Sequence, residues 1–201
     1  MKPRNVAILV FDDVELLDFC GPFEVFSSLD REQRPAPFKV FTVAPEPGHI
    51  TAANGLCVKH AHDFSTCPPV DVLVVPGGVG TRREMNNATV GDWVGRVSRE
   101  AELTLSVCTG ALLLARAGLL AGLRATTHHG AIDLLREVAP DAEVTAERRY
   151  VDNGNIVLSA GISAGMDMSL HVIARLHGIE AAQRTARHME YDWHREADET
   201  I

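Results

Sequence analysis

The stretch Leu103–Leu120, LTLSVCTGALLLARAGLL, decides how this chain folds. It begins as an apolar strand and continues as a helix that starts near Ala111, with only Cys108-Thr109-Gly110 between them. No cluster of turn-forming residues separates the two elements, so the chain must reverse very tightly. This is the geometry of a nucleophile elbow, which presents one side chain at the top of a sheet. The stretch therefore predicts a strand–turn–helix unit with Cys108 at its apex.

Cys108 has two interpretations from this stretch alone. Backbone N–H groups and the positive end of a helix dipole lower the pKa of a nearby thiol and favour the reactive thiolate. Alternatively, Cys108 is a small buried hydrophobe, as many unpaired cysteines are. The usual elbow has a glycine on both sides of the nucleophile; here Gly110 supplies the second, and Ser106 takes the place of the first.

Composition indicates one globular domain over residues 1–201, with 190–201 as a loose, charged tail. The chain is 46% hydrophobic and 23% charged, and its net charge of −8 argues against broad nucleic-acid contact. No apolar run is long enough for a membrane span, and the N-terminus is not typical of a signal peptide. We therefore expect a cytoplasmic protein with reduced thiols. Its four cysteines form no C-x-x-C pair, so we expect neither a zinc knuckle nor a redox dithiol.

Apolar strands alternate with helices along the chain. Val6–Phe11 and Val70–Val75 are continuous apolar runs, which are typical of strands buried on both faces. The pattern predicts an α/β fold: a mainly parallel open sheet with helices on both faces. Other expected elements are a strand at Phe38–Ala44, helices at Thr89–Ala101, Ala131–Val138, Met166–Leu176 and Ile179–Met189, and a hairpin of Val144–Val151 and Asn155–Ala160 around Asn153-Gly154.

Polar and glycine residues follow several of these strands. In open α/β sheets, ligands bind beyond the carboxyl ends of the strands. The residues expected to converge there are Asp18, Gly77, Gly78, Cys108, His128 and the loop 161–165. Gly77 and Gly78 form either a plain tight turn or, with their bare N–H groups, an oxyanion-type stabiliser.

Asp18 lies among apolar residues, just before a helix expected to begin near Pro22. It is either a capping or loop carboxylate, or an acid of raised pKa near the reactive centre. Cys20 is expected in the core. His60 and His62 alternate within an extended piece, where we expect two exposed histidines, with a metal pair as the alternative.

Four segments, taken together, resemble the ThiJ/PfpI superfamily. They are LLDFCGPFEVF (16–26), DVLVVPGG (71–78), LSVCTGALLLARAGLLAGLRATTHH (105–129) and VDNGNIVLSAGISAGMDMSLHVIARL (151–176). The resemblance runs from about Val6 to Leu176. It implies a flavodoxin-like three-layer sandwich related to class I glutamine amidotransferases, usually homodimeric. It also implies Cys108 as the elbow cysteine, Asp18 as its acidic partner, and backbone N–H groups of Gly77, Gly78 or Thr109 lining the pocket.

Within the superfamily, the motifs look most like isonitrile hydratases and the amino-terminal halves of AraC-type regulators. Peptidase-like members carry His directly after the nucleophile, where this chain has Thr109; His128 replaces that base only if folding brings it to Cys108. Deglycase-like members have Glu where Asp18 stands. The resemblance therefore implies cysteine-dependent hydration of a small electrophile, an isonitrile, to an N-substituted formamide. Cys108 is the nucleophile, Asp18 the acid and base, and Thr109 orients the water or holds Asp18.

Two alternatives belong to other classes. One is a small-molecule-sensing domain without catalysis, as in the regulators. The other is a glyoxalase or redox-stress protein that uses the low-pKa thiol. Neither a metal nor an organic cofactor is expected. The expected partners are a small-molecule substrate and a second copy of the chain, and neither nucleic acid nor a membrane.

Overall fold

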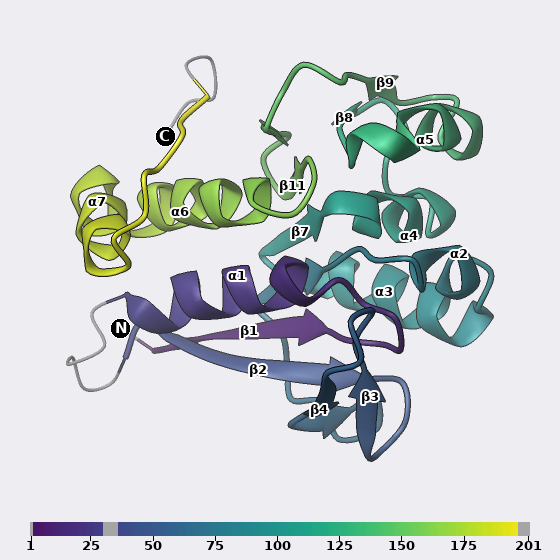
Figure 1. Ribbon diagram of the computed structural model, residues 1–201, viewed down its shortest axis with the longest axis horizontal. Coiled ribbons are helices and arrows are strands. Elements are labelled where there is room, and N and C mark those ends of the chain that lie inside the picture. The colour runs from purple at the N-terminus through teal and green to yellow at the C-terminus, as the bar shows by residue number, and fades with distance from the viewer. Residues whose placement is uncertain (1, 30–35, 197–201) are drawn as a thin grey trace.

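A seven-stranded central sheet organises the computed structural model, which describes residues 2–29 and 36–196 (Figure 1). Every neighbouring pair of strands is parallel except β10 and β11. The predicted flavodoxin-like, mainly parallel sheet is confirmed. In order across the sheet, the strands are β10 (Tyr150–Asp152), β11 (Ile156–Ser159), β7 (Leu103–Val107), β6 (Val72–Val75), β1 (Arg4–Leu9), β2 (Phe38–Ala44) and β5 (His62–Asp63).

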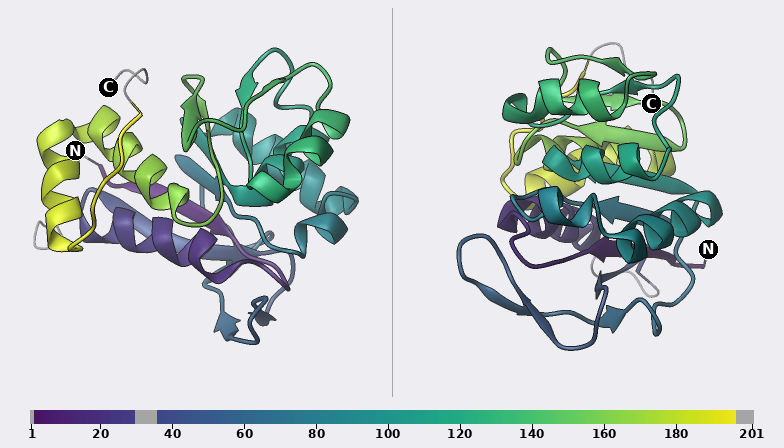
Figure 2. Two further views of the ribbon diagram at one scale, coloured as in Figure 1. Left: turned by 45° about the horizontal axis from the view of Figure 1, so that its top comes forward. Right: turned by 90° about the vertical axis from the view of Figure 1, so that its right-hand side faces the viewer.

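Helices cover both faces of this sheet (Figure 2). The connection β1–α1–β2 runs one way along the sheet, and β6–α3–β7 runs the other way. Parallel crossovers are right-handed, so these two connections place their helices on opposite faces. The helices are α1 (Leu16–Ser28), α2 (Thr81–Glu84), α3 (Ala88–Glu100), α4 (Ala111–Arg116), α5 (Ile132–Val138), α6 (Ala164–His177) and α7 (Ile179–His188). Helices α6 and α7 pack beside α1, and α4 packs beside α3.

The strand order reverses between β1 and β6. From β1 the chain first passes to β2 on one side, and it later returns to β6 on the other side. Ligand sites of open α/β sheets lie at such a switch point, beyond the carboxyl ends of the strands. The residues that follow β1, β6 and β7 are therefore brought to one place. The strands β6 and β7 are buried along their whole length, which fixes this edge firmly.

Helix α1 begins earlier than the sequence suggested. It starts at Leu16 and contains Pro22 in its interior, so Asp18 lies in its first turn and not before it. A proline inside a helix removes one backbone hydrogen bond and usually costs about 3 kcal/mol. The buried face of α1, which includes Phe19, Val25 and Phe26, offsets this cost by packing on the sheet. As a result, Asp18 is carried by a rigid element.

The predicted hairpin forms with a shorter first strand. β10 and β11 pair antiparallel around Asn153-Gly154, with Tyr150 opposite Ser159. The preceding residues do not continue β10. Instead Glu143–Val144 forms β9, which pairs with β8 (Arg124–Ala125) in a separate two-stranded sheet. The charged sequence Glu147-Arg148-Arg149 lies between β9 and β10, where a buried strand would have to cover these charges.

Two expectations about surface residues are wrong. His60 is buried, because the extended piece is interrupted between β4 (Cys57–Lys59) and β5, and the His60 ring turns back so that Nδ1 lies 2.9 Å from the His62 carbonyl oxygen. The two histidines therefore do not share a strand face. Cys20, which was expected in the core, is exposed on α1. The short strand β3 (His49–Thr51) pairs with β4 in a hairpin beside this part of the molecule.

The tail is not loose over the part that the structure describes. Tyr191 donates a hydrogen bond to the buried Asp167 carboxylate at 3.1 Å, and the His194 N–H donates to the same oxygen at 2.9 Å. The Glu196 N–H donates to the Tyr150 hydroxyl at 3.0 Å. A buried carboxylate requires such partners, so Asp167 fixes the segment to α6. The rest of the predicted tail, 197–201, lies outside the described residues.

Gly110 tests the elbow geometry, because a Cβ atom there would lie 2.0 Å from the Val75 carbonyl oxygen. We predict that Gly110→Ala lowers the free energy of unfolding by about 2–4 kcal/mol, since neither backbone can move away. Gly91→Ala is the matched control: no atom lies within 4 Å of its Cβ position in α3. That change should stabilise the protein by about 0.5–1 kcal/mol. Urea unfolding of both variants measures the difference, and equal effects would contradict the tight elbow.

Candidate active site

The elbow holds Cys108 in a conformation that is rare for a residue with a side chain. Its φ is +57°, at the start of a 3₁₀ turn over Cys108–Gly110 that leads into α4. Both backbone groups of Cys108 are fixed: its N–H donates to the Ala160 carbonyl at 3.1 Å, and its carbonyl accepts from the Thr127 hydroxyl at 2.7 Å. Strain of this kind clusters at functional sites.

Asp18 meets this elbow from α1. Its side chain is completely buried, and its Oδ2 accepts a hydrogen bond of 3.0 Å from the Gly77 N–H. Burial raises the pKa of Asp18 to about 7, although the Gly77 N–H and the Cys108 thiol both favour the carboxylate; the charge of Glu15 adds to the increase. Its Oδ1 has no hydrogen-bond partner within the described residues. Asp18 is thus an acid that is poised to gain or lose a proton near neutral pH.

The Cys108 sulfur is less ionised and less open than the sequence suggested. Burial, followed by the negative charge of Asp18, raises the pKa of Cys108 to about 12. The N–H groups of Thr109 and Ile162 hydrogen-bond to the sulfur and oppose this increase. Of the two interpretations of Cys108, the lowered pKa does not hold and the burial does, because desolvation of a residue that is only 5% exposed outweighs two N–H groups. The resting group is therefore a thiol.

Gly77 and Gly78 do not leave their N–H groups free. The Gly77 N–H is bound to Asp18, and the Gly78 N–H donates to Thr109 Oγ1 at 3.0 Å. A Cβ atom at Gly77 would lie 2.6 Å from Thr109 Oγ1 and 2.8 Å from Asp18 Oδ2, so only glycine allows this approach. The two glycines hold the acid and the threonine in place, so their N–H groups are not free for the expected oxyanion role.

The Thr109 hydroxyl is fixed on Gly78 and does not bond to Asp18 within the described residues. It donates to the Gly78 carbonyl at 3.1 Å and lies 3.1 Å from the hydroxyl of Thr81. Thr81 donates to the same carbonyl at 2.7 Å and is fully buried. Thr109 therefore acts on the sulfur through its backbone N–H. Nothing in the sequence distinguished Thr81 from a surface residue of a short helix.

Ile162 is the other residue that sequence reasoning missed. The loop 161–165 was expected at this edge, but not a bulky residue with a φ of +51° whose N–H reaches the sulfur. Its side chain is 36% exposed, and Val79, beside Gly78, is 66% exposed. Both are apolar side chains exposed in segments that follow strands of the sheet. The strained backbone of Ile162 depends on the tertiary fold and leaves no local trace in the sequence.

His128 lies at the same edge but does not reach the sulfur by any hydrogen bond among residues 2–29 and 36–196. Its ring rests on Gly161, where a Cβ atom would lie 2.4 Å from its Cδ2, and its Nδ1 accepts from the Gly130 N–H at 3.1 Å. Burial, and then the nearby His129 and Arg82, lower the pKa of His128. His128 is thus a neutral residue packed on Gly161 and not a base paired with Cys108.

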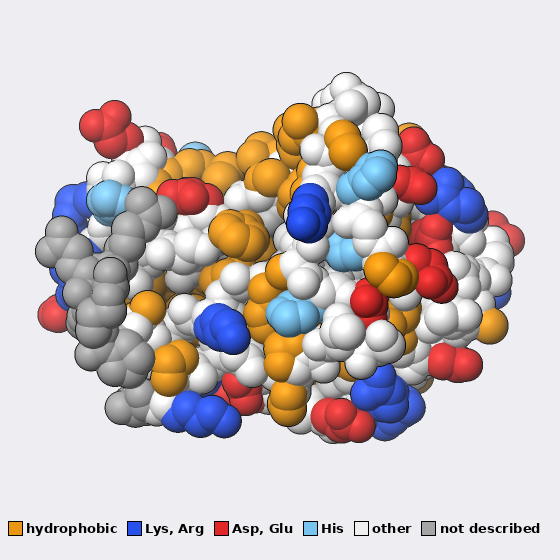
Figure 3. All heavy atoms as spheres, turned by 90° about the horizontal axis from the view of Figure 1, so that it is seen from below, with side chains coloured by type: hydrophobic (Ala, Val, Ile, Leu, Met, Phe, Trp, Pro, Cys, Tyr) orange, Lys and Arg blue, Asp and Glu red, His pale blue; other side chains and the backbone are white. Residues whose placement is uncertain are grey.

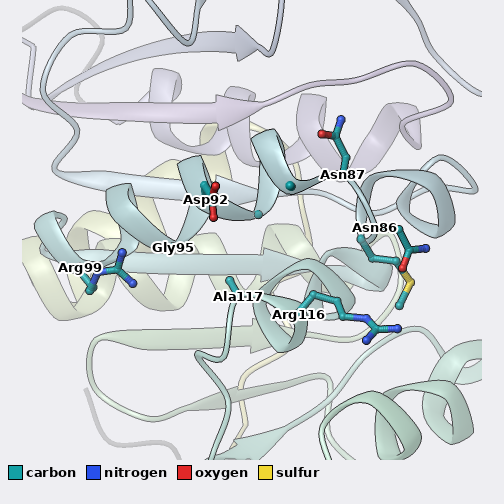
Figure 4. A pocket seen from close by; sticks show the side chains of 10 residues that line it. Asn86, Asn87, Asp92, Gly95, Arg99, Arg116 and Ala117 are labelled. Carbon is teal, nitrogen blue, oxygen red and sulfur yellow. The ribbon is translucent and has the colours of Figure 1, made fainter.

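Two grooves lie away from this site. One, of about 680 Å³, lies between α1, β2 and β4 and is lined by Phe19, Cys20, Phe23 and Phe41, among others. Hydrophobic side chains are exposed between charged ones on the face that carries β2 and the β3–β4 hairpin (Figure 3). The other groove, of about 510 Å³, lies between α3 and α4 (Figure 4). In it Arg99 and Arg116 lie at opposite ends, so their charges do not converge.

Within the described parts of the chain, no helix is both long and apolar enough to cross a bilayer. The same residues contain no group of three or more histidine, cysteine, aspartate or glutamate side chains placed to hold a metal ion.

Comparison with known proteins agrees with this architecture. Residues 4–175 match the model of the DJ-1/PfpI family. The chain belongs to the DJ-1/PfpI family. This DJ-1/PfpI chain is 36% identical over 187 residues to an isonitrile hydratase of Pseudomonas putida, covering 93% of this chain and 78% of that protein.

Regulators and solved structures match as well. The transcriptional regulator GbdR of Pseudomonas aeruginosa is 26% identical over 95% of this chain, which spans 52% of that regulator. A ThiJ/PfpI family protein from Pseudomonas syringae superimposes with a TM-score of 0.86 at 31% identity, covering 98% of this chain and 79% of that one. DJ-1beta of Drosophila melanogaster, at 18% identity over 96% of this chain and all of that one, shares the fold with a TM-score of 0.82.

The buried Asp18 predicts how stability depends on pH. Its pKa is raised to about 7 in the folded protein, so between about pH 4 and 7 the folded state still binds a proton that the unfolded state has released. This proton stabilises the folded state at low pH, and the stabilisation is lost as pH rises from about 4 to 7. We predict that the unfolding free energy of the wild type falls by about 2–3 kcal/mol relative to Asp18→Asn between about pH 5 and pH 8. Urea unfolding at several pH values tests this, and parallel curves for the two proteins would contradict it.

Proposed function

We propose that this protein hydrates an isonitrile to an N-substituted formamide by covalent catalysis at Cys108. The observation that carries the proposal is the buried pair of Asp18 and Cys108, in which each group shifts the pKa of the other. The likeness to the isonitrile hydratase of Pseudomonas putida supports this choice of substrate class. A slender electrophilic carbon suits a site where the sulfur is almost fully enclosed.

The first half-reaction forms a carbon–sulfur bond. The Asp18 carboxylate takes the thiol proton as the sulfur attacks the terminal carbon of the isonitrile. Asp18 then delivers that proton to the same carbon, which gives a thioimidate attached to Cys108. The Thr109 and Ile162 N–H groups stabilise the negative charge while it develops on sulfur. A pKa of about 7 suits Asp18 to both directions of transfer.

The second half-reaction adds water. Asp18, again a carboxylate, removes a proton from a water molecule, and the hydroxide adds to the thioimidate carbon while the nitrogen gains that proton. Breaking the carbon–sulfur bond releases the N-substituted formamide, and the sulfur regains a proton from the hydroxyl group. One water is consumed in total. Division of the reaction into two steps lowers each barrier.

A second candidate is a sensing domain that binds a small molecule without turnover. It is favoured by the match to GbdR, of which this chain spans about half. The two candidates differ in what the sulfur does: a sensor binds equally well without it.

Turnover of cyclohexyl isonitrile tests the proposal. We predict that Cys108→Ala abolishes formamide production and that Asp18→Asn lowers kcat by about 10²–10⁴-fold, as loss of a general acid–base does. Cys20→Ala is the control, since Cys20 is exposed in the groove beside α1, away from Cys108, and should keep wild-type turnover. Formamide formation is followed by NMR. Wild-type inactivity, or full activity of both site variants, would refute the proposal.

Alkylation of Cys108 gives an independent prediction. Asp18→Asn removes the negative charge that raises the pKa of Cys108, so the thiol should react faster with iodoacetamide at about pH 8 even though hydration is lost. Peptide mass spectrometry measures the rate at Cys108, with Cys57 as an exposed reference. An unchanged alkylation rate in the variant would show that Asp18 does not act on the sulfur.

We also propose that the protein is a homodimer, as expected from its sequence. Exposed Leu17 and Leu56, together with the apolar groove beside α1, offer surface for a second copy. Sedimentation of the intact chain should give a mass near twice 21.8 kDa. A monomer at micromolar concentration would contradict this.

A further inference from the structure

Arg82 carries a charge beside the active site that nothing else in the described residues neutralises. Its Nη1 makes two long contacts, to the Gly78 carbonyl at 3.4 Å and to the Thr81 hydroxyl at 3.5 Å. Neither acceptor is charged. A guanidinium can make up to five hydrogen bonds, so most of its capacity is unused here.

The neighbouring Arg83 shows what a structural arginine looks like in this fold. Its Nε lies 2.7 Å from Glu84, its Nη1 lies 3.1 Å from Asp13, and its Nη2 donates to the Asp12 carbonyl at 2.7 Å. This arginine ties α2 to the loop after β1. Two adjacent arginines on one short helix therefore differ: Arg83 is paired with carboxylates, and Arg82 has no carboxylate partner within the described residues.

Arg82 lies near the residues that surround Cys108. Arg82 contacts the Gly78 carbonyl and the Thr81 hydroxyl. The hydroxyl of Thr109, the residue after Cys108, contacts the same two groups, so Arg82 and Thr109 share these neighbours. On another side Arg82 is close enough to His128 to lower the pKa of that ring. His128 in turn rests on Gly161, next to the residue whose N–H reaches the sulfur. Arg82 and His128 thus approach the site from two different elements.

Glu15 is a negative charge in the same region. It acts on both Asp18 and His128, and it too has no ion pair within the described residues. Because Arg82 and Glu15 are not paired with each other, neither charge cancels the other at contact distance. A ligand's carboxylate can therefore bind the planar guanidinium through two hydrogen bonds, a geometry for which arginine is well suited.

We propose that Arg82 determines specificity, selecting substrates that carry a carboxylate on the group attached to the reacting nitrogen. Arg82 binds the carboxylate, and Cys108 attacks the terminal carbon. That the substrate is an isonitrile rests on the proposed function. The preference of the site for an anionic reagent at Cys108 does not rest on it.

The first experiment measures charge preference at the sulfur without any assumption about the reaction. Cys108 is alkylated with iodoacetate or with iodoacetamide, which differ mainly in charge, and the ratio of the two rates is obtained by peptide mass spectrometry. The ratio cancels changes in thiol pKa. Arg82→Gln should lower it about threefold to tenfold, and Arg83→Gln should leave it unchanged. High salt should reduce the wild-type preference and have little effect on Arg82→Gln.

The second experiment measures turnover of isocyanoacetate and of its neutral ethyl ester. Arg82→Gln should raise KM for the anion about tenfold, with kcat nearly unchanged, and should leave both constants for the ester as in the wild type. Arg83→Gln should alter neither KM.

The outcomes separate the two proposals. If the wild type hydrates no isonitrile but the alkylation ratio depends on Arg82, the anion preference stands and the proposed function fails. If the wild type hydrates the ester but Arg82→Gln changes neither the alkylation ratio nor KM for isocyanoacetate, the function stands and the assignment of Arg82 is overturned. Equal effects of Arg82→Gln and Arg83→Gln on the ratio would overturn it as well.

Discussion

The burial of one carboxyl group against one N–H is the constraint on which this structure depends. Asp18 is enclosed by α1 and receives a hydrogen bond from Gly77, which is possible only because Gly77 has no side chain. Enclosure makes ionisation costly and keeps the proton available near neutral pH. The same enclosure keeps the neighbouring sulfur protonated. The Asp18 carboxyl group and the Cys108 thiol are therefore coupled, and in the proposed reaction a proton moves between them.

The sheet supplies this unit by topology more than by local sequence. Asp18, Gly77 and Cys108 follow β1, β6 and β7, which are adjacent strands although their positions in the chain are far apart. The reversal of strand order between β1 and β6 leaves room at their carboxyl ends for side chains to meet. Glycine at positions 77, 78 and 110 then lets three backbone segments come closer than a Cβ atom would permit.

Much of the fold was predictable, because all-apolar strands and alternating helices depend on local composition. The turn at Cys108 and the start of α4 at Ala111 followed from the absence of turn-forming residues between them. The proline in α1 misled the prediction, since only tertiary packing shows that a helix tolerates Pro22. The protonation of Cys108 was also misjudged, because desolvation depends on neighbours that are distant in sequence. Thr81 and Ile162 became visible only once the fold placed them beside Thr109 and the sulfur.

The attachment of residues 191–196 to Asp167 has a practical consequence. Tyr191 also lies 3.4 Å from the Ser163 carbonyl, and Ser163 directly follows the residue whose N–H holds the sulfur. The last described segment is therefore connected by hydrogen bonds to the loop 161–165, which holds the Cys108 sulfur. An affinity tag or fusion partner attached immediately after Glu196 would therefore disturb the loop 161–165. A tag attached ahead of Arg4 lies at the opposite end of the parallel strands, away from Cys108 and the loop 161–165.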